Sequence, residues 1–201
     1  MAFNKIQNYN VIYRPIKYPR IEFKTGNLTL ILPYGYKPEN LVEKHQKWIK
    51  EKREFIEKIL REARNRRLVK RSEKKFRNLI SQIVTEFSDE LGVKVNRIFF
   101  RKMKTKWASY SSNKNLTINT LVKYLPAHLI KYLAYHEIAH GLQKRHNQQF
   151  WDVIVKKYPN YQNHEKELLA YWFVLQTTNS MEKSVNSYNL DSPIYMRLKS
   201  F

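Results

Sequence analysis

The sequence predicts an α+β fold in which a strand-rich N-terminal lobe precedes a helical domain with a small mixed sheet. Short β-branched and aromatic runs occupy residues 9–33, and long amphipathic patterns typical of helices follow from residue 38. Two further strand-like runs lie between the later helices. With 42% hydrophobic and 14% aromatic residues among 201, the chain has enough apolar material for a folded core.

The N-terminal lobe is expected to span residues 1–71 and to begin with a small sheet. The turn sequence TGN (25–27) between two strand-like runs is typical of a β-hairpin, and Pro33 closes the sheet. The predicted strands are YNVIYRPI (9–16), RIEFKT (20–25) and LTLILP (28–33).

A single amphipathic helix is predicted next, over residues 38–65. Pro38 suits a first helical turn, and apolar residues from Leu41 to Leu60 recur near helical spacing with Glu and Lys between them. We expect this helix to pack on the hairpin. The basic segment 61–71 then forms the boundary between the two lobes.

The second domain is expected to span residues 72–178 and to be mainly helical. Ser72 is a good N-cap and Gly92 a good C-terminal stop, so they predict a helix between them. The other predicted elements are strands at 95–103 and 116–120, a loop at 107–115 between them, helices from Pro126, from His146 and from His164, and a loose tail over 179–201.

The most informative segment is HEIAH, residues 136–140, in the helix that Pro126 opens. His136 and His140 are four residues apart, so both imidazoles lie on one helix face and can reach one zinc ion. Glu137 is turned about 100° around the helix from His136. We therefore expect its carboxylate to face the water that the zinc activates and to act as the catalytic base.

A catalytic zinc ion needs a third protein ligand, and this chain has no cysteine to supply it. His146 follows His140 by six residues, after Gly141, whose low helix propensity favours a break in the helix. A chain that turns back there brings His146 to the same ion as the third ligand. Glu165 and Glu167 are the alternative ligands.

Further motifs precede and follow the histidines in a specific order along residues 9–175. They are LILPYGYKPENL (30–41), KWI (47–49), KWASYS (106–111), INTLV (118–122), Pro126, His136, Glu137, His140, His146, Phe150, Trp151 and Pro159. In this order they resemble the YgjP-like metallopeptidase family, zincins related in motif to the WLM and SprT-like proteases. The resemblance implies a zincin-like fold, with a mixed sheet packed on the HExxH helix, and a protein or peptide substrate.

Two segments depart from the pattern of that family. Ala108 and Tyr110 stand where the family has Gly and Cys in the loop before the site, and Thr120 and Leu121 replace a Trp-Arg pair. We expect these positions to shape the substrate cleft. Substrate preference is therefore the property that transfers least from the family to this chain.

The sequence thus predicts a zinc-dependent hydrolase, with a metallopeptidase as the first hypothesis. A phosphohydrolase acting on nucleotides is an alternative, although the four glycines form no phosphate-binding loop. A basic nucleic-acid-binding module with a structural metal is the other alternative. Spacing does not identify the residue that stabilises the oxyanion; Tyr135, Tyr158 and Arg145 are near the motif in sequence.

The formal net charge of +21 bears on possible partners. Residues 61–77 alone hold nine basic and two acidic side chains. Such a field attracts nucleic acid or another polyanion, and a solubilising surface is the other interpretation. No run approaches the roughly 18 apolar residues of a membrane span, and residues 1–10 lack an apolar signal core. We therefore expect a cytoplasmic protein that does not contact the membrane.

Overall fold

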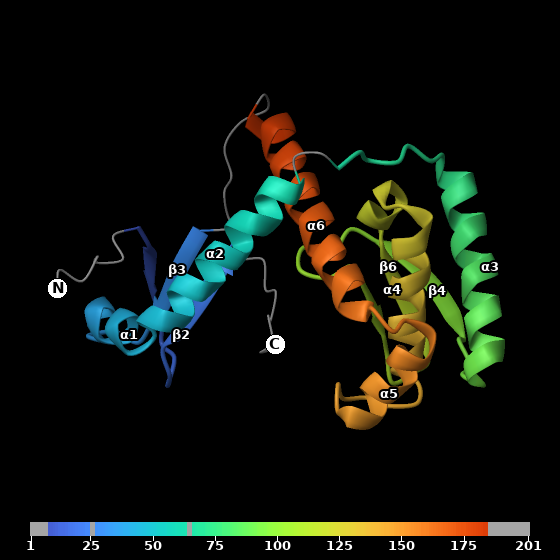
Figure 1. Cartoon of the computed structure of the whole chain (residues 1–201), viewed down its shortest axis with the longest axis horizontal. Coiled ribbons are helices and arrows are strands. Elements are labelled where there is room, and N and C mark those ends of the chain that lie inside the picture. The colour runs from blue at the N-terminus through green and yellow to red at the C-terminus, as the bar shows by residue number, and fades with distance from the viewer. Residues whose placement is uncertain (1–7, 25–26, 64–65, 185–201) are drawn as a thin grey trace.

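A computed structural model describes residues 8–24, 27–63 and 66–184 of the chain. Two small sheets lie in different parts of the molecule, and helices connect and cover them (Figure 1). The predicted α+β class is confirmed, with its strand-rich N-terminal lobe, its helical second part and its mixed sheet. Along the described chain, no helix combines the length and apolar character needed to cross a membrane.

The first sheet has the strand order β1-β3-β2, in which β1 pairs parallel and β2 antiparallel with the central strand. Lys24 pairs with Asn27, which confirms the predicted hairpin, although residues 25–26 lie outside the described part of the chain. One face of β3 packs on the following helices through Leu28, Leu30 and Leu32. The strands are β1 (Asn10–Tyr13), β2 (Arg20–Lys24) and β3 (Asn27–Leu32).

The prediction of a single helix over residues 38–65 is wrong. The structure has two helices, α1 (Pro38–Lys44) and α2 (Gln46–Ala63), which are separated at His45. The His45 N–H donates to the carbonyls of the last turn of α1, and its own carbonyl accepts from Ile49 at 2.9 Å. Apolar residues of both helices contact the same sheet, so the break leaves little trace in the apolar spacing.

The second sheet has the order β4-β6-β5, with β4 parallel and β5 antiparallel to β6. The loop predicted over residues 107–115 is therefore wrong at 108–110, which form the edge strand β5. Three residues are too few to show an alternation, and Ala has a low strand propensity. The strands are β4 (Arg97–Arg101), β5 (Ala108–Tyr110) and β6 (Asn115–Asn119), followed by a 3-10 helix (Thr120–Tyr124).

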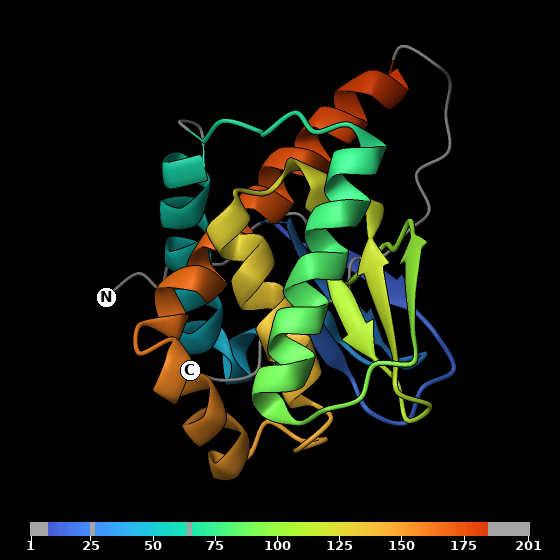
Figure 2. The same cartoon turned by 90° about the vertical axis from the view of Figure 1, so that its right-hand side faces the viewer.

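Helices α3 (Glu73–Leu91) and α4 (Ala127–Ala139) share one core with this sheet (Figure 2). The predicted ends of α3 are confirmed. The Ser72 hydroxyl accepts from the Lys75 N–H at 3.3 Å, and Gly92 has the left-handed φ of 62° that a helix C-cap favours. Most residues of helix α4 are buried, and its last turn carries the partly buried His136 and Glu137.

Helices α5 (Gln148–Lys157) and α6 (Tyr161–Ser184) complete the fold. Helix α6 packs on α4 and also on α2, where Ile56 and Ile59 meet Leu169 and Phe173. The loose tail predicted from residue 179 is wrong as far as Ser184, because α6 continues to that residue and no Gly or Pro interrupts the chain there. The remainder of the predicted tail lies outside the described residues, and the domain boundary after residue 71 stays a prediction.

Candidate metal centre

The last turn of α4 and the loop after it bring the three predicted ligands together. His136 lies in the last turn of α4, His140 is its C-cap, and His146 lies just before the N-cap of α5. The Nε2 atoms of His136 and His146 are 3.0 Å apart. One nitrogen from each of the three rings lies within 4.8 Å of the other two, so the group could hold a metal ion.

The predicted break near Gly141 is confirmed, and a close contact explains it. A Cβ atom at residue 141 would lie 2.3 Å from Cγ1 of Val93, far inside van der Waals contact. Glycine therefore allows the chain to turn past Val93 directly after His140. At the other end of the loop, the Asn147 side chain accepts from the Phe150 N–H at 3.0 Å and starts α5.

Hydrogen bonds and stacked rings hold the imidazoles in place. His140 Nδ1 lies 3.0 Å from the Gln143 carbonyl oxygen, a contact that assigns the N–H to Nδ1 and leaves Nε2 for a metal. Phe150 stacks on His140 with ring centroids 4.7 Å apart, and Trp151 stacks on His146 at 5.6 Å. These contacts limit the rotation of the rings and keep the nitrogens convergent.

The three histidines fit a zinc ion. Burial lowers the pKa of His136 well below its usual value, and the neighbouring His140 and His146 lower it further. Burial also lowers the pKa of His140, so both rings favour the neutral form that binds metals. Two nitrogens bound to a tetrahedral zinc ion lie about 3.3 Å apart, which is near the 3.0 Å between His136 and His146.

Glu137 lies beside the histidines and contacts the edge strand β5. Its Oε2 accepts a hydrogen bond from the Tyr110 N–H at 3.0 Å. Burial raises the pKa of Glu137 to about 7, although this hydrogen bond and the charge of Lys106 act in the opposite direction. A cation bound at the histidines would lower this pKa, because it stabilises the charged carboxylate. Such a group can accept and return a proton near neutral pH.

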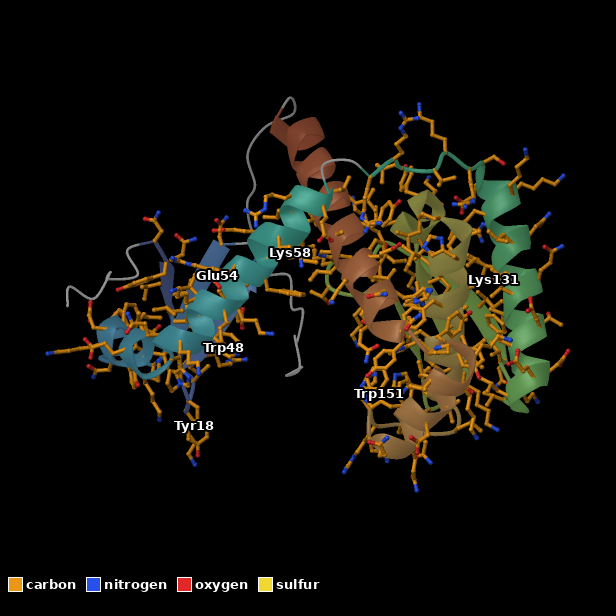
Figure 3. All side chains as sticks on the ribbon, in the orientation of Figure 1. Tyr18, Trp48, Glu54, Lys58, Lys131 and Trp151 are labelled. Atoms are coloured by element: carbon orange, nitrogen blue, oxygen red, sulfur yellow. The ribbon has the colours of Figure 1, made fainter. Side chains whose placement is uncertain are left out.

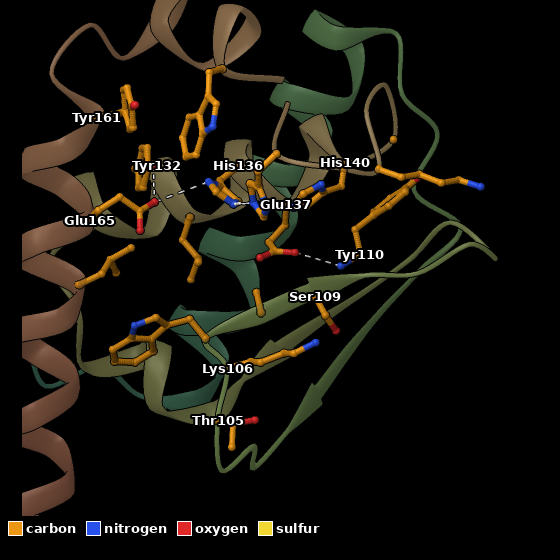
Figure 4. Close-up of a pocket in the computed structure, with 18 of the residues that line it drawn as sticks. Thr105, Lys106, Ser109, Tyr110, Tyr132, His136, Glu137, His140, Tyr161 and Glu165 are labelled. Atoms are coloured by element: carbon orange, nitrogen blue, oxygen red, sulfur yellow. Dashed lines mark hydrogen bonds and ion pairs between the residues drawn. The ribbon is translucent and has the colours of Figure 1, made fainter. Parts of the chain in front are cut away.

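A cavity of about 1210 Å³ opens onto the histidines and Glu137. Figure 4 shows α6 with Glu165 on one side of it, and Lys106, Ser109 and Tyr110 around β5 on the other. Phe55 of α2 also lines the cavity. The site is therefore a cleft between the edge strand and α6, and the N-terminal part of the chain contributes to its wall.

The alternative carboxylate ligands lie elsewhere. Glu165 accepts a hydrogen bond from the Tyr132 hydroxyl, and its Oε1 lies 3.6 Å from Nδ1 of His136, the nitrogen that faces away from His146. Glu167 lies outside the cavity, 2.9 Å from His128 and 3.4 Å from Arg66. These positions favour His146 as the third ligand and leave Glu165 beside the His136 ring, beyond hydrogen-bond distance of Nδ1.

Several expected cleft residues are placed differently by the structure. Within the described residues, Tyr135, Tyr158 and Arg145 do not line the cavity, so none of these oxyanion candidates is supported. Among the departures from the family pattern, Ala108 and Tyr110 line the cavity, whereas Thr120 and Leu121 do not. Leu121 instead belongs to the hydrophobic core.

The sequence interpretation placed Tyr110 at the cleft, but it missed the hydrogen bond from the Tyr110 N–H to Glu137 and the position of Lys106 in the cavity wall. Both belong to the KWASYS segment, whose place among the family motifs was a signal that it contributes to the site. Trp107 in the same segment has two roles, because it packs edge-on against Trp172 at 4.8 Å and also lines the cavity.

The chain resembles known proteins in sequence and in structure. The chain is similar to two crystal structures of metallopeptidase zymogens, abylysin of Pyrococcus abyssi and jannalysin of Methanocaldococcus jannaschii. Abylysin is 20% identical with a TM-score of 0.38, over 51% of this chain and 95% of its own. Jannalysin is 27% identical with a TM-score of 0.41, over 49% of this chain and 96% of its own. No curated protein matched the sequence.

The family model of the YgjP-like metallopeptidase domain matches residues 58–171, more than half of the chain, and the chain therefore belongs to this family.

Proposed function

We propose that this protein is a zinc-dependent peptidase in which His136, His140 and His146 hold the metal and Glu137 is the general base. The observation that carries the proposal is the convergence of three imidazoles and one carboxylate at a single cavity. Family membership supports a metal-dependent peptidase, and the donor set of three histidines without cysteine supports zinc.

Each residue then has a definite task in peptide hydrolysis. Bound zinc supplies Lewis acidity, which polarises the scissile carbonyl and makes water more acidic. Glu137 accepts the proton of the attacking water and then gives it to the leaving amide nitrogen. The Tyr110 N–H holds Oε2 of that carboxylate, so Oε1 is the atom that carries the proton.

The edge strand β5 offers a way to position an extended substrate. It forms the edge of the β4-β6-β5 sheet, and residues 105–112 line the cavity along it. An extended segment can pair with a sheet edge through main-chain hydrogen bonds, largely independent of its own sequence. We place the substrate backbone along β5, with the scissile bond beside Glu137.

One part of the cavity is apolar and suits a large hydrophobic side chain. Five apolar side chains from α2, α4, α6 and the β5 segment line it. They are Phe55, Trp107, Leu133, Leu168 and Leu169. Because these residues come from distant parts of the sequence, this subsite exists only in the folded chain.

Metal analysis and a Glu137→Gln variant test the proposal. After zinc loading and dialysis, we expect about one zinc per chain in both proteins, since the substitution leaves the imidazoles in place. Hydrolysis of peptides or unfolded proteins should fall by roughly 10²–10⁴-fold in the variant, because it lacks the proton acceptor.

Near wild-type turnover by zinc-loaded Glu137→Gln would show that this residue is not the base. A panel of nucleotides in the same assay separates the peptidase from the phosphohydrolase alternative. Zinc-dependent and Glu137-dependent hydrolysis of nucleotides, without hydrolysis of peptides, would replace the peptidase proposal.

A further inference from the structure

We propose that the cleft selects peptide segments that carry acidic side chains next to the scissile bond. The inference rests on the proposed peptidase function and names the substrate class of that site. Four lysines from four different parts of the chain surround the cavity. They are Lys106 before β5, Lys114 in the turn between β5 and β6, Lys144 between two of the histidines, and Lys166 on α6.

These lysines are available to a substrate. All four are exposed, and none forms an ion pair with another residue in the described part of the chain. Figure 4 shows the side chain of Lys106 extended beside β5, near Ser109. Lys106 lines the same cavity as Glu137 and His140.

The two acidic side chains of the cavity already have hydrogen-bond partners within the protein. Among the described lining residues, only Glu137 and Glu165 are acidic. Glu137 is held by the Tyr110 N–H and assigned as the base, and Glu165 is bound to the Tyr132 hydroxyl beside His136. Apart from the four lysines, the other polar residues that line the cavity are serines, a threonine, tyrosines and histidines. No further carboxylate among these residues is available to a basic substrate side chain.

The cleft is therefore net positive where a substrate binds, with four lysines against two carboxylates. A bound zinc ion adds to this positive charge, because three neutral imidazoles do not offset the charge of the ion. Aspartate or glutamate side chains on a bound segment gain from several lysines at once, and the same field steers acidic segments toward the cleft. Each exposed pair contributes little, so the preference is a sum over the four lysines and weakens as salt screens it.

Positive charge elsewhere on the molecule requires a matched control. Figure 3 shows Lys58 on α2 and Lys131 on α4, well separated from each other on the surface. Lys74 near the start of α3 is exposed and does not line the cavity. Lys74→Glu changes the net charge as much as Lys106→Glu or Lys144→Glu, but it leaves the charge of the cleft unchanged.

The experiment compares peptides that share one apolar core and differ only in their flanks: Asp/Glu, Asn/Gln, or Lys. With the zinc-loaded full chain at low salt, we expect kcat/KM for the acidic peptide to exceed that for the amide peptide by about tenfold. The lysine peptide should be the poorest substrate. Lys106→Glu and Lys144→Glu should each lower the acidic-to-amide ratio severalfold, whereas Lys74→Glu should preserve it. Raising the salt should lower the ratio in the wild type.

A binding measurement keeps this inference separate from the peptidase proposal. Fluorescence anisotropy with zinc-loaded Glu137→Gln reports whether the acidic peptide binds more tightly than the amide peptide, even if nothing is cleaved. Equal binding and equal cleavage of the two peptides would overturn the inference while leaving the peptidase intact. An equal effect of Lys74→Glu and Lys106→Glu would also overturn it.

The lysines would be assigned to nucleic acid instead if a single-stranded oligonucleotide bound tightly, Lys106→Glu abolished that binding, and the peptides showed no preference.

Discussion

The two sheets of this protein have the same topology but different roles. In each, the third strand of the set is central, the first strand pairs with it in parallel and the second pairs antiparallel. The first sheet packs on α1 and α2, which carry no metal-ligand group within the described residues. The second places its short edge strand against α4, the helix that carries His136 and Glu137. The two sheets thus share a topology, and the second lies against the helix that carries candidate site residues.

The largest difference between the two halves should appear when a metal ligand is removed. His146→Ala leaves two imidazoles, and we expect zinc affinity to fall by more than about 100-fold in a chelator-competition assay. His128→Ala is the matched control, because His128 is exposed on α4 and pairs with Glu167 outside the cavity. Unchanged affinity in His146→Ala would transfer the third-ligand role to another group, with Glu165 as the first to examine.

Shortening one buried side chain in the central strand of each sheet compares the contributions of the two sheets to stability and activity. Leu30 in β3 and Ile118 in β6 are both fully buried, so each change to Ala should lower the free energy of unfolding by about 2–5 kcal/mol. Ile118 pairs with Ala108 of β5, so only its loss should also reduce kcat/KM of the folded fraction. Denaturant unfolding and peptide hydrolysis at a temperature where both variants are folded measure the two effects. An equal loss of activity in Leu30→Ala would show that the first sheet supports the site as directly as the second.

A smaller effect is expected where the loop of the metal centre passes the core. Gly141→Ala should cost about 1–3 kcal/mol of folding stability, because the new methyl group overlaps Val93. The double variant with Val93→Ala should recover part of that loss, and a double-mutant cycle measures the coupling. Strictly additive losses would mean that the close contact with Val93 is not the reason for glycine at this position.

The smallest predicted effect tests what the N-terminal half contributes to the cleft. Phe55→Ala should lower kcat/KM by about three- to tenfold for peptides with a large apolar side chain, and zinc content should not change. Leu60→Ala is the control, since Leu60 packs against the same α2–α6 core without lining the cavity. Equal losses in the two variants would indicate a general loosening of α2 instead of a lost subsite contact.

Local features of the sequence predicted that His136, His140 and His146 come together. His136 and His140 lie on one helix face because they are four residues apart. Gly141 then allows a short loop that brings His146 back to them. The hairpin at residues 25–27 and the ends of α3 were predictable for the same reason, because turn and cap residues act on their immediate neighbours.

Features that depend on distant partners were missed. Strand β5 is stabilised by pairing with β6 and by the bond from Tyr110 to Glu137, 27 residues further along the chain. Phe55 reaches the cavity only because α2 packs on α6. No periodicity within 105–112 or around residue 55 contains this information, so the cleft walls were less predictable than the ligands.

Helix α6 also has a consequence for the order of events during synthesis. It follows the histidines along the chain, yet it supplies Glu165 and part of the apolar wall and covers the α2 face. A nascent chain that has emerged only to residue 160 already contains the three histidines and Glu137 but lacks one side of the cleft. The cleft is therefore complete only once α6 has been synthesised and has packed on α4 and α2.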